Sequence, residues 1–184
     1  MKIMIITSSP NKDGLTAVCG EQARLGAISA GAGATVVSLN DLGVGMCHAC
    51  DNGWGPCKDQ HVCQVEDDFQ KLHASLKVAD GFILVTPVYW GDLSESAKAF
   101  IDRLRRCEAF KKEDQYLAGK PFICVAAAGG SGNGCMSCLV IMEKFVDHVK
   151  GTKLDFIGVT RRNREYKLKA IYEAARVMGR EEII

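Results

Sequence analysis

The sequence has no apolar run long enough to cross a membrane as a helix, and it begins in a strand-like segment without a secretory signal pattern. Its net charge of +1 shows no excess of either sign, so composition favours neither nucleic acid nor a membrane surface as a partner. Internal repeats and linkers are also absent. Nine cysteines without an export signal indicate a reducing compartment, and we expect the cytoplasm.

A chain of 184 residues with 47% hydrophobic content is long enough for a substantial core, and we expect a single domain over residues 1–184. Apolar strands alternate with helical patterns along the whole length. The predicted strands are residues 2–7, 35–39, 82–86, 122–127 and 154–159. Five strands and five helices in alternation predict an α/β fold, a doubly wound parallel sheet with helices on both faces.

The predicted helices carry apolar residues at helical spacing, and some have recognisable starts. Asp67 or Asp68 is expected to cap the second helix. Asp92 to Glu95 match a capping box before the third helix, with Ser94 as the competing cap. For the first helix, the expected buried stripe is Leu15, Val18, Cys19, Gln22 and Leu25.

One segment interrupts this alternation. Residues 40–66 lie between the second strand and its helix, far longer than the usual connection of about 2–6 residues. Four of the nine cysteines lie in it. Its cysteine and tryptophan content argues against disorder, so we expect a functional, cysteine-rich insertion.

A phosphate-binding loop is predicted directly after the first strand. Ser8 to Thr16 (SSPNKDGLT) lead into a helix start, where backbone N–H groups and the hydroxyls of Ser8, Ser9 and Thr16 can bind phosphate oxygens. The loop lacks both the G-x-G-x-x-G dinucleotide pattern and the G-K-[ST] ending of a P-loop. It therefore predicts a phosphate on another kind of ligand, although these residues also suit an ordinary turn.

Two further loops leave the carboxyl ends of predicted strands, where open parallel sheets bind ligands. Residues 87–91 (PVYWG) place two aromatic side chains after the third strand, and residues 128–134 (AGGSGNG) form a glycine-rich loop after the fourth. Taken singly, the aromatics suit a core or an interface and the glycines suit turns. The three loops together favour a flat ring with a phosphorylated tail, namely flavin mononucleotide (FMN).

The chain resembles the flavodoxin-like NAD(P)H-dependent FMN reductases, and within them the branch related to iron–sulfur flavoproteins. The resemblance lies in the first-strand loop, in residues 86–104 (TPVYWGDLSESAKAFIDRL) and in the cysteine run that ends in CQVEDDF at Phe69. It covers the chain to about Gly134. It implies a flavodoxin-like sheet of five parallel strands in the order 2-1-3-4-5.

The resemblance also implies a cofactor site built from the three loops. The first would bind the FMN phosphate, the second would follow the ring and the ribityl chain, and the third would close on the ring edge. Many relatives have an arginine in the first loop, and Lys12 is its replacement here. The implied cofactor-binding residues are Ser8, Ser9, Asn11, Lys12, Gly14, Leu15, Thr16, Pro87, Val88, Tyr89, Trp90, Gly91, Ala128, Gly129, Gly130 and Ser131.

No catalytic acid or base is predicted, because a flavin carries the redox chemistry itself. Tyr89 is the nearest candidate donor, but packing against the ring is its preferred role. The expected partners are NAD(P)H and a small-molecule or protein electron acceptor. The resemblance further implies a homodimer or a homotetramer.

Four thiols of the insertion, Cys47, Cys50, Cys57 and Cys63, form a run that can bind zinc or an iron–sulfur cluster. The histidines of the segment, His48 and His61, are possible substitute ligands. The related iron–sulfur flavoproteins use a tighter spacing, so free thiols are the favoured interpretation and no metal site is predicted.

Two patterns in the second half of the chain are ambiguous. Cys135 and Cys138 form a C-x-x-C pair at a helix start, where the dipole lowers the pKa of a thiol, but packing is favoured over redox chemistry. A basic run from Arg161 to Lys169 suits either the 2′-phosphate of NADPH or a solvated helix start. The remaining cysteines lie in patterns typical of a core: Cys19, Cys107 and Cys124.

Three functions stay open at this point. The preferred one is an FMN-binding oxidoreductase that transfers electrons from NAD(P)H to a flavin, quinone or similar acceptor. The second is an electron-transfer flavoprotein with a cysteine-bound iron–sulfur cluster. The third is a non-catalytic regulator that has kept the flavodoxin fold.

Overall fold

Five apolar segments form one parallel sheet in the computed structural model, which describes residues 1–180. The strands are β1 (Lys2–Thr7), β2 (Gly33–Ser38), β3 (Gly81–Pro87), β4 (Pro121–Ala128) and β5 (Thr152–Thr160). Their order is β2-β1-β3-β4-β5, which confirms the predicted topology. Every residue of β3 and β4 is buried, and this explains why their sequences are continuously apolar. Residues 181–184 of the predicted domain lie outside the described part.

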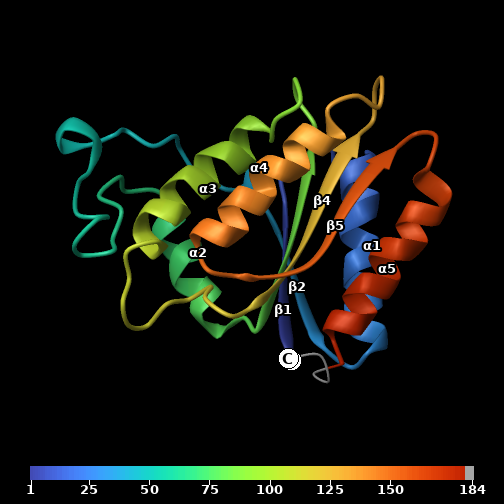
Figure 1. Ribbon diagram of the computed structural model, residues 1–184, viewed down its shortest axis with the longest axis horizontal. Coiled ribbons are helices and arrows are strands. Elements are labelled where there is room, and N and C mark those ends of the chain that lie inside the picture. The colour runs from blue at the N-terminus through green and yellow to red at the C-terminus, as the bar shows by residue number, and fades with distance from the viewer. Residues whose placement is uncertain (181–184) are drawn as a thin grey trace.

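Helices cover both faces of this sheet (Figure 1). On one face, α1 (Leu15–Ser29) and α5 (Arg164–Met178) enclose one hydrophobic core. On the other face, α2 (Phe69–Ser75), α3 (Glu95–Glu108) and α4 (Cys135–His148) enclose a second core. None of the helices within residues 1–180 has the length and apolar character to cross a bilayer.

The buried face of α1 differs from the predicted stripe. Cys19 is buried as expected, but Leu25 is 39% exposed. Small residues face inward because α5 lies very close, and a Cβ on Gly26 would stand 2.1 Å from the carbonyl oxygen of Tyr172. The prediction was wrong for Leu25, because the contact with α5 admits only small side chains, whereas Leu15 is partly buried against the core. The buried residues are Thr16, Cys19, Gly20, Ala23, Gly26 and Ala27.

A side chain caps the start of α3, whereas the N-cap residue of α2, Asp68, makes no side-chain cap bond. Ser94 caps α3, since its Oγ accepts a hydrogen bond from the N–H of Ala97 at 3.4 Å. The competing cap was therefore right and the capping box at Asp92 was wrong. At the start of α2, Asp67 Oδ1 accepts from the N–H of Phe69 at 2.9 Å, while the neighbouring Asp68 carboxylate binds the insertion at the N–H of Gly43.

The cysteine-rich residues 40–66, here called the insertion, run along α3 on the outside of the fold (Figure 1). The segment is irregular, with short 3-10 turns at Leu39–Asp41 and Asp51–Gly53. Several of its non-glycine residues have positive φ, among them Ala49, Asp51, Asn52 and His61. Such backbone requires support from elsewhere in the molecule, and α3 supplies it.

Candidate functional site

The loops that follow β1, β3 and β4 lie at one edge of the sheet, because the strands are parallel and share their direction. Figure 1 shows the loops after β3 and β4 projecting from the same end. We call them the first loop (residues 8–16), the second loop (residues 87–92) and the third loop (residues 128–134). Their backbones and side chains make the candidate site.

The first loop is held in shape by its own hydrogen bonds. The N–H of Asn11 donates to Ser9 Oγ at 3.2 Å, and the N–H of Asp13 donates to Asn11 Oδ1 at 3.2 Å. Gly14 stands at the N-cap of α1 without a side-chain cap, so the first N–H groups of the helix remain available to an anion. The Thr16 hydroxyl, although Thr16 is buried, has no hydrogen-bond partner within residues 1–180.

Ser8 and Lys12 of the first loop were expected to face a ligand, but both contact other parts of the protein. Ser8 is 2% exposed, and its Oγ donates to the carbonyl oxygen of Val85 at 3.4 Å. Ser8 therefore fastens the loop to β3. Lys12 Nζ forms a 2.9 Å ion pair with Asp41. Because both side chains are exposed, this pair is weak, and Lys12 can exchange it for an anion.

A tight turn in the second loop presents the aromatic residues. Tyr89 and Asp92 exchange backbone hydrogen bonds of 3.0 and 2.9 Å. The central residues Trp90 and Gly91 have φ of +52° and +80°, and a left-handed conformation is strained for a residue as bulky as Trp90. The turn leaves the indole fully exposed, whereas Tyr89 is 38% exposed. Trp90 thus stands at the rim of the site.

The second and third loops border a cavity of about 540 Å³, a volume within the range of small-molecule sites. The loops touch where a Cβ on Gly134 would lie 2.7 Å from the Cα of Gly91, whereas Gly129 and Gly130 face open space. Backbone can therefore approach a flat ligand closely. The cavity is lined by Val88, Trp90, Gly91, Ala128, Gly130, Ser131, Gly132, Asn133, Gly134 and Ser137.

A second, polar hollow of about 240 Å³ lies beside the first loop. Of the residues predicted from the sequence, Ser9, Asn11, Lys12 and Thr16 line this hollow. Val88, Trp90, Gly91, Ala128, Gly130 and Ser131 line the larger cavity. Ser8, Gly14, Leu15, Pro87, Tyr89 and Gly129 line neither of the two. Polar groups for a phosphate and a slot for a ring therefore occur at the same edge of the sheet.

Ser94 joins the first loop to the end of β3, directly before the second loop, a role beyond the helix cap that the sequence predicted. Its N–H donates to Thr86 Oγ1 at 3.1 Å, and its Oγ donates to the carbonyl oxygen of Ser8 at 2.8 Å. Ser94 and Thr86 are both buried. The bonded residues are far apart in the chain, so only the fold brings them together.

Arg103 fastens the insertion to α3. Its side chain is 0% exposed and pairs with the carboxylate of Asp67. It donates to the carbonyl oxygens of Gly45 at 3.0 Å and Val65 at 2.9 Å, and to Cys63 Sγ at 3.3 Å. Burial alone raises the pKa of Asp67, but the hydrogen bonds from Arg103 and backbone N–H groups outweigh burial and hold the pKa low. Arg103 lies three residues after the buried Phe100 on α3, and this helical spacing was the available signal.

The four cysteines of the insertion line one small cavity against α3, together with Arg103 and Arg106. Its volume is about 20 Å³, roughly the space of one water molecule. Within residues 1–180, no three His, Cys, Asp or Glu side chains are grouped so that they could hold a metal ion. Among residues 1–180, two buried side-chain nitrogens have no hydrogen-bond partner: Arg106 Nε, at this cavity, and Nδ1 of His61 in the insertion. The thiols are thus gathered, but they do not fit a metal as they stand.

The other thiols are packing groups. Burial raises the pKa of Cys19, Cys107 and Cys138 to about 12. Burial also raises the pKa of Cys135 at the start of α4, so the predicted lowering by the helix dipole was wrong. The favoured packing role of Cys135 and Cys138 agrees with their burial, as does the predicted core position of Cys124.

Known relatives of this sequence are iron–sulfur flavoproteins. The chain is 31% identical to that of Methanosarcina thermophila over 137 residues, which are 73% of this chain and 66% of the relative. It is 32% identical to one from Methanocaldococcus jannaschii over 105 residues, which are 57% of this chain and 52% of the relative. The match thus spans between half and two thirds of the length of these relatives.

Solved structures share the fold. A flavodoxin from the domain Archaea has a TM-score of 0.65 and 13% identity, with 98% of each chain covered. An NAD(P)H:quinone oxidoreductase from Methanothermobacter marburgensis has a TM-score of 0.69 and 18% identity, with 100% of this chain and 96% of that chain covered. At these identities the likeness shows the flavodoxin-like fold alone. A family model described as NADPH-dependent FMN reductase matches residues 1–154, so the chain belongs to this family and FMN is its cofactor.

Proposed function

We propose that this protein is a flavin-dependent oxidoreductase that takes electrons from NADPH or NADH and reduces a flavin, quinone or similar acceptor. The observation that carries the proposal is the cavity of about 540 Å³ between the second and third loops. It lies at the same sheet edge as the polar first loop, and a flat ring with a phosphorylated tail needs both. Membership in the FMN reductase family supports the nicotinamide donor.

The first loop would hold the FMN phosphate. The uncapped start of α1 offers backbone N–H groups, and the Thr16 hydroxyl lies beside them without a protein partner in the described residues. Ser9 and Asn11 line the same hollow. Lys12 adds a positive charge once it leaves Asp41. Anion binding here would depend mainly on N–H and hydroxyl groups.

The second and third loops would hold the isoalloxazine ring. When bound, FMN supplies the redox chemistry, accepting hydride from a nicotinamide and passing reducing equivalents to an acceptor. The backbone of residues 129–131 would lie along the ring edge, and the turn at Trp90 would limit access from solvent. Tyr89 stands outside the cavity lining, so we assign it no proton-transfer role.

An anaerobic reductive titration tests this function. The protein is reconstituted with FMN and titrated with NADPH and, separately, with NADH. We expect the visible absorbance of oxidised flavin to disappear and to return when a quinone or free FMN is added. A bound flavin that stays oxidised with both coenzymes would refute the proposal, and failure of FMN to bind would favour a non-catalytic regulator.

The gathered thiols support a second candidate, an electron-transfer flavoprotein with an iron–sulfur cluster. The supporting observation is that Cys47, Cys50, Cys57 and Cys63 line a single cavity. A volume of about 20 Å³ is too small for a cluster, so the insertion would have to open during assembly. Iron and acid-labile sulfide analysis of anaerobically purified protein decides the matter, and absence of both removes this candidate.

We also propose, from the family resemblance, a cytoplasmic homodimer or homotetramer. Light scattering on the FMN-loaded protein measures the assembly, and a monomer at micromolar concentration would contradict it. Cell fractionation tests the location.

A further inference from the structure

Two arginines stand exposed directly after β5, at the edge of the sheet that carries the ligand loops. Both side chains, those of Arg161 and Arg162, are exposed. Within residues 1–180, neither guanidinium has a hydrogen-bond or ion-pair partner. Free guanidinium groups beside a binding site are suited to an anion, because their planar forks match phosphate oxygens.

The turn that carries these arginines is firmly held. The N–H of Thr160 donates to Asn163 Oδ1 at 2.6 Å, and Asn163 Nδ2 donates to the carbonyl oxygen of Gly158 at 3.3 Å. The N–H of Arg162 donates to Thr160 Oγ1 at 3.2 Å. The backbone of the pair is therefore placed by the fold, and only the two side chains are free to move.

The same turn adjoins the cavity between the second and third loops, here called the ring cavity. A Cβ on Gly132, which lines that cavity, would stand 3.3 Å from Cγ2 of Thr160. The loops after β4 and β5 also lie at the same end of the sheet (Figure 1). Arg161 thus follows directly after a residue that touches the cavity wall.

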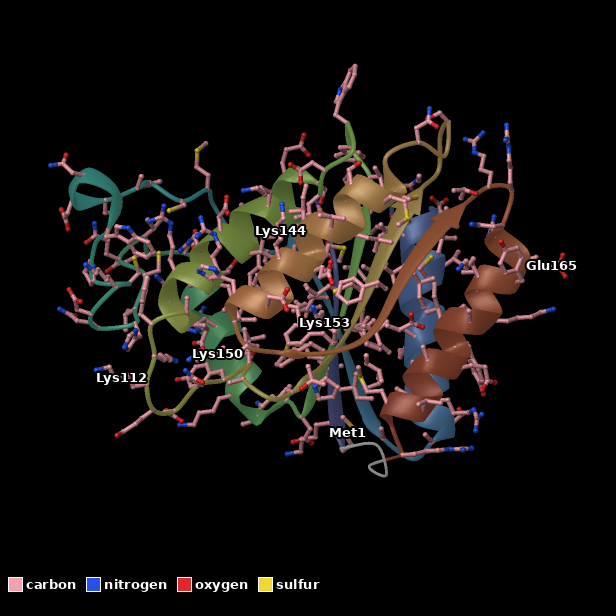
Figure 2. The ribbon with its side chains drawn as sticks, viewed as in Figure 1. Met1, Lys112, Lys144, Lys150, Lys153 and Glu165 are labelled. Atoms are coloured by element: carbon pink, nitrogen blue, oxygen red, sulfur yellow. The ribbon has the colours of Figure 1, made fainter. Side chains whose placement is uncertain are left out.

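The later part of the basic run turns away from the site. Arg164 is the first residue of α5, the helix that packs beside α1. Lys169 pairs with Glu165 at 3.7 Å, and Figure 2 shows Glu165 pointing outward from the start of α5. Within this basic run, Arg161 and Arg162 directly follow β5 at the ligand edge.

The cavity itself has no charged side chain in its lining. A nicotinamide coenzyme that stacks its ring on a flavin held there must carry its diphosphate, and in NADPH also its 2′-phosphate, out of the cavity. These anionic groups need cations from neighbouring elements. We propose that Arg161 and Arg162 form a subsite for a phosphate group of the nicotinamide coenzyme, an inference that rests on the proposed function.

Coenzyme kinetics of the FMN-loaded variants Arg161→Ala, Arg162→Ala and the double variant test the subsite. We expect the KM to rise about tenfold per arginine, as for the loss of a charge-assisted hydrogen bond. A rise for NADPH alone assigns the pair to the 2′-phosphate, and an equal rise for NADPH and NADH assigns it to the diphosphate. FMN affinity should stay unchanged. Lys144→Ala is the matched control, since Lys144 is an exposed cation on α4 (Figure 2).

Binding of fragments separates this inference from the proposed function. Isothermal titration of the FMN-loaded protein with adenosine 2′,5′-bisphosphate and with ADP-ribose needs no electron transfer. Weaker binding of either fragment by the double variant supports the subsite even if neither coenzyme reduces the flavin. Coenzyme KM values and fragment affinities that change no more than in Lys144→Ala would overturn the inference.

Discussion

Replacing Gly134 with alanine should force the second and third loops apart. Gly134 has φ of +82°, and its added Cβ would lie 2.7 Å from Gly91 Cα and 3.1 Å from Gly91 N. Both atoms belong to the backbone, so no side-chain rotation can relieve the contact. Gly91 is itself held in the turn between Tyr89 and Asp92. One of the two loops must therefore move.

The cost has two parts. A left-handed conformation costs alanine about 1 kcal/mol relative to glycine, and an overpacked contact costs about 1–3 kcal/mol. We expect a total of about 2–4 kcal/mol, which lowers the melting temperature by about 5–15 °C for a chain of this size. Because these loops border the ring cavity, FMN affinity should also fall about tenfold or more.

Gly119→Ala is the matched control for this experiment. Gly119 also has a positive φ, +73°, but nothing lies within 4 Å of its added Cβ. It should therefore lose about 1 kcal/mol of stability and keep its FMN affinity. Calorimetry and flavin-fluorescence titration measure both quantities. If Gly134→Ala matches Gly119→Ala in both, the contact between the loops does not shape the site.

Four other perturbations follow from the structure. Thr16→Ala should weaken FMN binding more than Lys12→Ala, because the Thr16 hydroxyl lacks a protein partner within residues 1–180. If fluorescence titration gives Thr16→Ala the same dissociation constant for FMN as the parent protein, the first loop is only a turn. Ser94→Ala should lower the free energy of unfolding by about 1–3 kcal/mol and weaken FMN binding, and calorimetry that shows no loss would contradict its connecting role. Arg103→Met should cost about 3 kcal/mol in chemical denaturation and speed proteolysis in the insertion, whereas unchanged cleavage would show that other contacts hold it. Burial raises the pKa of Glu108, but its hydrogen bonds outweigh burial and leave the pKa below the ordinary 4.5. The contribution of Glu108 to the free energy of unfolding is therefore present at neutral pH and is lost as the pH falls below about 4.5. Glu108→Gln should make the free energy of unfolding depend less on pH in that acid range.

Local sequence patterns predicted only part of the structure of the insertion. Its length and cysteines marked it as unusual. The helical spacing of Arg103 placed this residue beside the buried side of α3, but no local pattern indicated that it would bind the insertion. Arg103 bonds to Gly45 and Val65, which lie on opposite sides of the cysteine run. In a helical pattern an arginine is expected to be exposed to solvent. Arg103 is buried only because the insertion folds over α3. The same segment decides that the four thiols share a cavity.

The strands were predictable because their causes are local, whereas their order followed from the family resemblance. A central parallel strand such as β3 is buried on both faces, so its sequence is continuously apolar wherever it is read. The loops after β1, β3 and β4 were predictable as ligand loops for the same reason, since strand direction places them at one edge.

Contacts between distant segments were decided only by the tertiary structure. Leu25 lies outside the core because α5 approaches α1 closely at Gly26. The sequence pattern does not indicate how close the two helices are. Ser94 bonds to Ser8, and Gly134 meets Gly91, through positions that local propensity does not relate. The sequence by itself determined which segments are strands, helices and ligand loops, because periodicity and turn chemistry act over a few residues. The shape of the site depended on close packing between those segments, which exists only once the chain has folded.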